Sequence, residues 1–280
     1  MPADLHCHTK MSDGCLSIEE IVLLAKRRGI TTISVTDHDT FAGSTRAKIF
    51  GDRRGVKVLS GVEFSAADYS TKRKVHILCY LSDHTDRLEG LCKRTRDARR
   101  RSAVIMMQKV MTIYPIPAEM IMRRAQGSTN IYKQHIMHAL VDAGYADGFF
   151  GTVFHRLFNS KNGLAYMPIK YPEVHDVIEQ IHEAGGVAVL AHPGLYDSCN
   201  LLKQLAADGE IDGVEVWYPR IKEGEEEQFK EIASNYNLVM TGGTDFHGLY
   251  QPDPKPLGTC TTPDEELEKL FYVKSHPRSK

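Results

Sequence analysis

The sequence predicts an α/β fold that closes into a barrel or a similar arrangement, and two observations support this prediction. Short apolar runs rich in β-branched residues alternate with amphipathic helical patterns, which indicates a parallel sheet with helices outside it. Residues of metal-ligand type stand at positions i and i+2 near each end of the chain, His6 with His8 and Asp245 with His247. Residues two apart on a strand point to the same face, so each pair could grip a metal ion. A site shared by both pairs would bring the chain ends together.

Seven strands are expected in chain order. They cover residues 3–5, 32–35, 56–61, 74–80, 187–190, 213–217 and 238–241. Ser17 and Glu20 form the capping-box pattern that opens a helix after the first strand, and Gly29 ends that helix. Further helices are predicted for residues 172–185, opened by a proline, and for residues 223–236.

The interval between the fourth and fifth strands is far longer than the others, at about 100 residues. A structureless loop of that length is not expected in a compact domain. Apolar residues recur at helical spacing in 97–111 and 131–143. We therefore predict a helical insertion over the barrel mouth at residues 92–170, with the barrel formed by residues 1–91 and 171–280.

The overall composition limits the possible partners and setting. A net charge of −1 argues against a binder of long nucleic acid, because such domains carry a basic excess. The six cysteines include no CxxC pair, which favours free thiols in a reducing compartment. No signal-peptide pattern precedes the first strand, and no apolar run approaches the roughly 20 residues that span a bilayer. A cytoplasmic protein without a membrane partner is expected.

Histidines and carboxylates occur at or just beyond the ends of most predicted strands, and strand ends converge on one face of a barrel. A single such histidine would be read as structural, but five of the 13 histidines occupy these positions. Imidazole and carboxylate ligands suit Mn²⁺, Fe²⁺ or Zn²⁺. The candidate metal ligands are His6, His8, Asp13, His38, Glu63, His76, His192, Asp245 and His247. His76 is the exception in position, because it lies inside the fourth predicted strand.

Nine ligands exceed what one ion needs, so the sequence predicts a bi- or trinuclear site bridged by a carboxylate such as Glu63. Clustered divalent ions lower the pKa of a bound water from about 15.7 toward roughly 7 and hold both the attacking and the leaving oxygen. This chemistry favours hydrolysis of a phosphate ester by a metal-bridging hydroxide. No other nucleophile is required.

The ordered motifs resemble those of the polymerase and histidinol phosphatase (PHP) family along the whole chain. They are Asp4-Leu5-His6-Cys7-His8-Thr9, Ser12-Asp13-Gly14, Thr36-Asp37-His38-Asp39, Gly61-Val62-Glu63, Val75-His76, Ala191-His192-Pro193 and Asp245-Phe246-His247-Gly248. The resemblance implies a distorted (β/α)₇ barrel, three divalent metal ions and phosphoesterase activity.

The resemblance also implies how the ligands divide among the ions. One ion would be held by His6, His8, Glu63 and Asp245, a second by Asp13, His38 and His247, and a third by Glu63, His76 and His192. Asp13 departs from the histidine that some family members have there, which bears on metal identity and occupancy at the second position.

Within the family, the chain resembles the stand-alone bacterial branch that carries a helical insertion. That branch includes nucleotide 3′,5′-bisphosphate phosphatases, short-RNA 5′-exonucleases and a cyclic phosphodiesterase. Its insertion usually contains an Arg-Pro-His stretch, where this chain has Tyr132-Lys133-Gln134-His135. It also usually contains a Gly/Lys-rich stretch ending in Ala-Tyr-Val-Pro, where this chain has Lys161-Asn162-Gly163-Leu164-Ala165-Tyr166-Met167-Pro168. The missing arginine bears on the substrate, because lysine is a point charge where arginine would bind phosphate with two hydrogen bonds.

Candidate substrate-binding and catalytic residues follow from these motifs. Lys133, His135 and Lys161 are the phosphate-binding candidates, with solvent-exposed helix and loop charges as the alternative. Asp37 is the candidate proton shuttle beside His38, with support of the ligands as the alternative. His192 and His247 complete the catalytic candidates. The basic run at residues 94–101 reads either as an electrostatic funnel or as one solvated helix face.

The leading hypothesis is a metal-dependent phosphoesterase that acts on a small phosphorylated substrate, such as a phosphomonoester, a nucleotide bisphosphate or a cyclic phosphate. One alternative is a 5′-3′ exonuclease on short RNA. Another is an amidohydrolase that cleaves a C–N bond, although many of those enzymes use a bridging lysine where this chain has Glu63. A third is a metal-bound scaffold without catalysis. The sequence leaves the substrate, the metal and the oligomeric state open.

Overall fold

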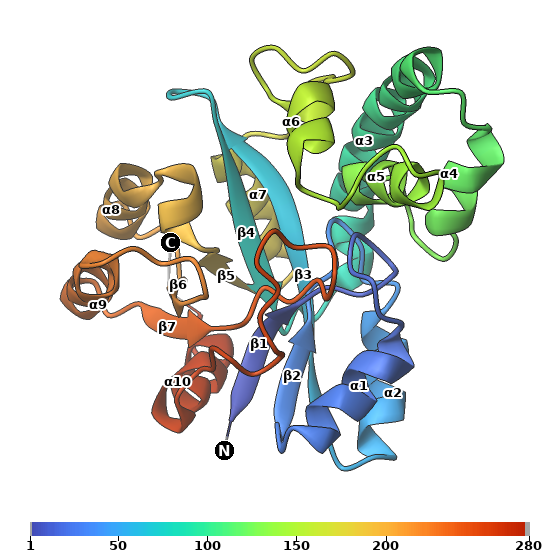
Figure 1. Cartoon of the computed structure of the whole chain (residues 1–280). Coiled ribbons are helices and arrows are strands. Elements are labelled where there is room, and N and C mark those ends of the chain that lie inside the picture. Colours follow the sequence, from blue (N-terminus) through green and yellow to red (C-terminus); the bar gives the residue numbers. More distant parts are fainter. Residues whose placement is uncertain (1, 278–280) are drawn as a thin grey trace.

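The computed structural model describes residues 2–277, and one seven-stranded sheet forms its centre (Figure 1). The strands are β1 Ala3–Cys7, β2 Thr32–Val35, β3 Lys57–Asp68, β4 Arg73–Tyr80, β5 Val187–Leu190, β6 Gly213–Trp217 and β7 Val239–Gly242. They lie in the sheet in the same order as in the chain. The sheet curves into a nearly closed barrel with helices around it, which confirms the predicted distorted (β/α)₇ fold.

One strand corrects the expectation of a parallel sheet. β1 to β3 are parallel to one another, and so are β5 to β7, but β4 is antiparallel to both of its neighbours. Only residues 69–72 separate β3 from β4. A connection this short joins antiparallel strands, because a parallel pair needs a crossover of a dozen or more residues. The resulting β3–β4 hairpin extends beyond the barrel beside the insertion helices (Figure 1).

The two ends of the sheet meet where β7 approaches β1. The backbone N–H of His8 donates to the carbonyl of Phe246 at 2.8 Å, and the N–H of Phe246 donates to the carbonyl of His6 at 3.3 Å. Gly243 makes the approach possible, because a Cβ atom built there would lie 2.4 Å from the backbone nitrogen of His6. The chain ends therefore come together, as the two ligand pairs predict.

The helices cover the outside of the barrel and form the insertion. They are α1 Ile18–Arg27, α2 Ser44–Asp52, α3 Thr85–Ile113, α4 Ala118–Arg124, α5 Lys133–Asp142, α6 Thr152–Phe158, α7 Val174–Glu183, α8 Cys199–Ala207, α9 Glu225–Asn235 and α10 Asp264–Ser275, with a 3₁₀ turn at Pro193–Tyr196. The predicted capping box of α1 is present, with Ser17 and Glu20 bonded reciprocally. Gly29 follows that helix with a φ of 71°, as a helix-ending glycine does. No helix within residues 2–277 is both long enough and apolar enough to cross a membrane.

The insertion has a hydrophobic core of its own but shares its first helix with the barrel. Leu88 and Leu91, near the start of α3, pack in the barrel core. Met106 and Val110, farther along the same helix, pack against α4, α5 and α6. The predicted division between residues 91 and 92 therefore falls inside α3, which crosses from one core to the other. The separate core supports the insertion, and its exact edges stay a prediction.

Candidate metal centre

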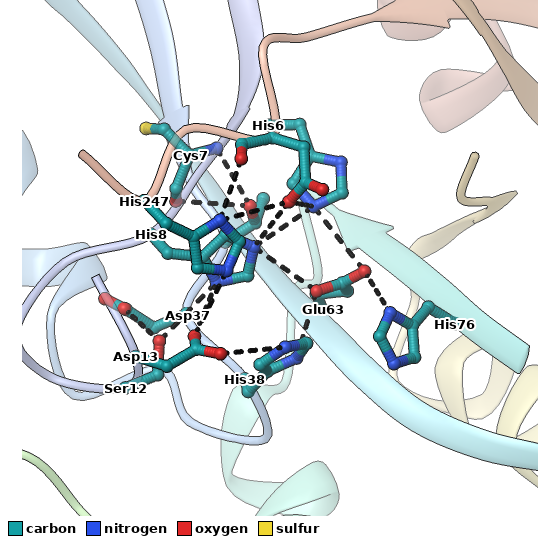
Figure 2. A network of polar contacts seen from close by, with 12 residues as sticks. His6, Cys7, His8, Ser12, Asp13, Asp37, His38, Glu63, His76 and His247 are labelled. Atoms are coloured by element: carbon teal, nitrogen blue, oxygen red, sulfur yellow. Dashed lines mark hydrogen bonds and ion pairs between the residues drawn. The ribbon is translucent and has the colours of Figure 1, made fainter. Parts of the chain in front are cut away.

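Nine histidine and carboxylate side chains gather at one end of the barrel, and Figure 2 shows most of them in one network. All nine are buried, with at most 8% of any residue exposed. Their donor atoms form four overlapping groups, and the atoms of each group lie within 4.8 Å of one another. The groups are His8, Asp13, His38 and His247; His6, Glu63 and His192; His6, His8 and Asp245; and His38, Glu63 and His76. The structure thus brings together every candidate metal ligand of the sequence.

Glu63 lies at the centre of this cluster. It sits inside β3, which continues well past it, and not after the strand as the sequence indicates. Its Oε1 atom lies 2.6 Å from His76 Nδ1 and 3.0 Å from His192 Nε2. Its Oε2 atom lies 2.9 Å from His38 Nδ1 and 3.3 Å from His8 Nε2. Histidine nitrogens near both oxygens are the arrangement expected of a carboxylate that bridges two ions.

The position of His76 follows from the direction of β4. Because β4 is antiparallel, its first half and not its end reaches the site, and His76 pairs there with Ser65 of β3. His76 therefore reaches the cluster from inside a strand because β4 runs in the opposite direction to its neighbours.

Two further carboxylates complete the cluster. Asp245 Oδ1 lies 3.3 Å from His8 Nε2 and 3.5 Å from His6 Nε2, and Arg220 donates to its other oxygen at 2.9 Å. Asp13 Oδ1 lies 3.3 Å from His247 Nε2. Asp245 therefore faces the β1 histidines, and Asp13 faces His247.

Two of the candidate ligands have a strained backbone. His192 has a φ of 27° and Asp245 a φ of 48°, in the left-handed region that residues with a Cβ atom seldom adopt. Such a conformation costs about 1–3 kcal/mol and persists only where the surroundings enforce it. His192 lies two residues after β5 and Asp245 three residues after β7, and both side chains belong to the cluster.

The donor set fits divalent cations. Asp13 Oδ1 and His38 Nδ1 are buried and lie within ion-pair distance of His247 and Glu63, but neither atom makes a hydrogen bond in the described part of the chain. The Nε2 atoms of His6 and His8 lie only 3.2 Å apart. Lone pairs that converge in this way are satisfied by a shared cation, and imidazole with carboxylate is the ligand chemistry of Mn²⁺, Fe²⁺ and Zn²⁺.

The ionisation of the cluster also favours the binding of cations. Burial opposes ionisation of Glu63, but the positive charges of His76 and His38 hold its pKa well below the usual range. Burial would lower the pKa of His8, but hydrogen bonds to Asp245 and Glu63 raise it to about 10. Glu63 thus remains ionised and His8 holds a proton, and a bound metal ion would take the place of that proton.

Glu215 also belongs to the site, although it is not among the candidate residues predicted from the sequence. It is fully buried on β6, where its Oε1 accepts a hydrogen bond from His6 Nδ1 at 2.9 Å and its Oε2 accepts one from the backbone N–H of His192 at 2.9 Å. A carboxylate can only accept, so Nδ1 of His6 carries the proton and Nε2 presents a lone pair to the cluster. A glutamate in the middle of the apolar run Gly213–Trp217 was the signal that could have identified it.

Asp37 lies beside the cluster and supports the loop that carries Asp13. It accepts hydrogen bonds from the backbone N–H of Thr9 at 2.8 Å, from the Thr9 hydroxyl at 2.7 Å and from the Ser12 hydroxyl at 2.6 Å. These contacts match the support role that the sequence reading left open beside the proton shuttle.

The predicted substrate-binding residues are placed differently from one another. Lys133 is the first residue of α5 and packs against the rings of Phe158 and Tyr166. His135 is buried and accepts a hydrogen bond from the backbone N–H of Tyr132, and burial lowers its pKa to about 4. Lys161 is exposed, and no contact within residues 2–277 joins its side chain to the cluster. All three stay predictions.

The basic run at residues 94–101 is not a single surface. Arg99 is buried and donates to Asp39 and to Ser65, each at 2.8 Å. Arg96 donates to the carbonyl of Asp39, while Arg100 and Arg101 are exposed on α3. Two arginines of the run, Arg96 and Arg99, thus contact the barrel, and the other three, Arg94, Arg100 and Arg101, are exposed.

Comparison with known proteins assigns the chain to a family. The model of the PHP domain matches residues 4–242. The phosphoribosyl 1,2-cyclic phosphate 1,2-diphosphodiesterase of Eggerthella lenta is 36% identical, over 89% of this chain and 95% of its own length. The 5′-3′ exoribonuclease Rnm of Escherichia coli is 33% identical, over 90% of this chain and 86% of its own length.

A solved structure agrees with these relatives. A protein of Bifidobacterium adolescentis, provisionally classed as a metal-dependent phosphoesterase, superimposes with a TM-score of 0.86 and 30% sequence identity. The superposition covers 97% of each chain. The family match, the relatives and the cluster at the barrel mouth lead to one conclusion: this chain is a member of the PHP domain family.

Proposed function

We propose that this protein hydrolyses a phosphate ester of a small molecule at the nine-residue cluster, with divalent metal ions as cofactors. The observation that carries the proposal is the overlap of four ligand groups around one buried carboxylate, Glu63, which two of the groups share. Overlapping groups of this kind suit several ions close together, which is what the transfer of a phosphoryl group to water requires.

The reaction class is that of a metal-dependent phosphoesterase. The Eggerthella lenta relative acts on a cyclic phosphate and the Escherichia coli relative on RNA, so both hydrolyse phosphate esters. We therefore propose a phosphomonoester, a nucleotide bisphosphate or a cyclic phosphate as the substrate of this chain, and 5′-3′ cleavage of short RNA as the second candidate.

We further propose three ions, each Mn²⁺, Fe²⁺ or Zn²⁺, held by the ligand sets that the family resemblance implies. Bound ions would activate water and neutralise charge on the phosphate. The chain's own contribution is to orient the ligands: Glu215 directs His6, and Asp37 holds the loop of Asp13. We also propose that His192 and His247 exchange a proton with the substrate. Cytoplasmic location and the lack of a long nucleic acid partner remain predictions.

The test is phosphate release by the purified protein, with metal content measured in parallel. The substrate panel contains nucleoside bisphosphates, cyclic phosphates, histidinol phosphate and short RNA, and ammonia release is followed on amide substrates. His8→Ala and Asp245→Ala should each abolish phosphate release while the circular dichroism spectrum stays unchanged, because each removes a ligand from the His6–His8–Asp245 group. The exposed His84 provides the control, since His84→Ala should keep full activity.

Removal of metal gives a second, independent outcome. Dialysis against a chelator should abolish activity, and one of the three metals should restore it. Full activity in protein shown to be free of metal would refute the proposal, and ammonia without phosphate would favour the C–N hydrolase.

A further inference from the structure

Asp39 is buried next to the metal cluster but is not one of its ligands. It directly follows His38, and its φ of 54° places its backbone in the left-handed region. Its backbone N–H donates to the carbonyl of Glu63 at 3.0 Å. Within residues 2–277 its side chain belongs to none of the four ligand groups. A strained residue of this kind persists only where its surroundings hold it in place.

The carboxylate of Asp39 is bound to β3 at Ser65. Ser65 donates to Oδ1 from its backbone N–H at 2.9 Å and to Oδ2 from its hydroxyl at 3.1 Å. It lies two residues after Glu63 on β3 and pairs with His76 on β4. Asp39 and Ser65 therefore connect the backbone segments that carry one complete ligand group, His38, Glu63 and His76, whose side chains Figure 2 shows together.

Arg99 supplies a positive charge to this contact. It is buried, and one of its terminal nitrogens donates both to Asp39 Oδ2 and to the hydroxyl oxygen of Ser65, each at 2.8 Å. Since that hydroxyl donates in turn to Asp39, the three side chains form a closed set of hydrogen bonds. Hydrogen bonds between charged groups are roughly twice as strong as neutral ones, and buried networks of this kind become rigid.

Because Arg99 lies on α3, the contact extends to the insertion. Arg96, three residues earlier on this helix, donates to the backbone carbonyl of Asp39 at 2.9 Å. The Arg99 guanidinium carbon lies 4.8 Å from the ring of Tyr132, and that ring lies 6.3 Å from the ring of His38. Farther along, α3 packs in the hydrophobic core of the insertion. The segment of His38 and Asp39 is therefore held by β3 and by α3 together.

The His38 ring depends on this backbone support. His6 has a carboxylate behind it, because Glu215 accepts the hydrogen bond of its Nδ1. In contrast, His38 Nδ1 makes no hydrogen bond within residues 2–277. The position of the ring is therefore set mainly by the backbone that Asp39 holds. Partners that fix metal ligands in this indirect way typically contribute 10- to 100-fold to metal affinity.

We propose that Arg99, acting through Asp39, is a positioning residue for the His38–Glu63–His76 group, and that metal binding at this group depends on the contact between α3 and the barrel. The inference rests on the metal centre of the proposed function. It adds to that function a dependence of one metal position on the first helix of the insertion. It holds for any phosphate ester that the protein hydrolyses.

The test measures how tightly the full-length protein holds Mn²⁺. Protein loaded with Mn²⁺ is titrated with a chelator of known strength, and the bound Mn²⁺ is counted at each step. In Arg99→Met, one class of bound Mn²⁺ should be held roughly 10- to 100-fold more weakly, while the remaining Mn²⁺ is held as in the wild type. Arg99→Lys should lose less affinity, because one nitrogen makes both hydrogen bonds and the lysine ammonium has three donors. Arg100→Met, exposed on the same helix, is the matched control and should equal the wild type.

A double variant keeps the test decisive where Arg99→Met alone does not fold. Arg99→Met combined with Asp39→Asn leaves no buried charge unpaired, and asparagine tolerates a positive φ. If Arg99 acts through Asp39, the double variant should lose no more affinity than Asp39→Asn alone.

The outcomes separate this inference from the function on which it rests. Unchanged Mn²⁺ binding in Arg99→Met, equal weakening of all bound Mn²⁺, an equal loss in Arg99→Lys, or a further loss in the double variant would overturn it. A wild type that binds no divalent ion would refute the metal centre and this inference with it. If the wild type binds Mn²⁺ but hydrolyses nothing, only the proposed activity fails, and the same titration decides the role of Arg99.

Discussion

Glu215 shows how one buried carboxylate can set the state of two histidines at once. It accepts hydrogen bonds from His6 Nδ1–H and from the backbone N–H of His192, so its two oxygens act on two of the four ligand groups. Carboxylates that orient metal-binding histidines raise the basicity of the ligand and typically contribute 10- to 100-fold to metal affinity. The position of this residue is therefore as important as that of a ligand.

Glu215→Gln should lower metal affinity by roughly 10- to 100-fold without unfolding the protein. An amide has one acceptor instead of two, so either His6 changes tautomer or the N–H of His192 meets another donor. Affinity is measured by competition with a chelator of known strength. Glu226→Gln, on α9 and outside the cluster, is the matched control and should leave the affinity unchanged. Wild-type affinity in Glu215→Gln would show that the contact has no role in metal binding.

At the scale of elements, the direction of β4 and the closure between β7 and β1 position the site. β4 brings His76 to the barrel mouth by running against its neighbours. The end of β7 brings Asp245 and His247 against His6 and His8, and this needs a backbone contact that only glycine permits at position 243.

Gly243→Ala should separate the two halves of the metal centre. The added methyl group would lie 2.4 Å from the backbone nitrogen of His6, so the end of β7 must move away from β1. We expect loss of bound metal, loss of phosphate release and a stability decrease of about 1–3 kcal/mol, typical of overpacking. Metal analysis and urea denaturation measure these effects.

The control for this variant is Gly90→Ala on α3. Its new Cβ would meet only Arg94 at 3.5 Å, an ordinary contact. Alanine is favoured over glycine in a helix, so this variant should be neutral or up to about 1 kcal/mol more stable. If Gly243→Ala retained its metal as Gly90→Ala should, tight closure would not be needed for the site.

At the scale of the whole molecule, the insertion is fastened to the barrel at the site itself. The Ser128 hydroxyl donates to the carbonyl of Ser12 at 2.6 Å, and the N–H of Thr129 donates to the carbonyl of Met11 at 2.9 Å. Tyr250, in the loop after β7, forms a 2.6 Å hydrogen bond with His138 of α5. The insertion is thus held against the loops that carry the ligands.

Because of these contacts, the insertion and the barrel should unfold together. Trp217 on β6 is the single tryptophan of the chain, so its fluorescence reports the barrel, while far-UV circular dichroism is sensitive to the insertion helices. The two signals should change at the same urea concentration. Tyr250→Phe should lower stability by about 0.5–1.5 kcal/mol through the lost hydrogen bond, whereas Tyr272→Phe on the exposed face of α10 should have little effect. Separate transitions in the wild type would contradict this coupling.

The sequence predicted much of this arrangement, because its signals are local. Short apolar, β-branched runs between helical patterns identified the strands, and the capping box identified the start of α1. The spacing of ligand-type residues identified all nine members of the cluster. The prediction of a parallel sheet was wrong at β4, because the pattern of apolar residues is the same whichever direction a strand runs. Arg99 looked like part of a solvated face, since nothing in a basic helix marks which residue finds a buried partner.

The sequence by itself determined the fold class and the chemistry of this protein, because strand periodicity and the identity of metal-ligating side chains are properties of short segments. Only the tertiary structure decided which residues act together. Glu215 meets His6 across 209 positions of the chain. Asp39, Ser65 and Arg99 come from a loop, a strand and a helix, and the three meet only once α3 lies against the barrel. The arrangement of the metal centre depends on such distant contacts, and packing alone creates them.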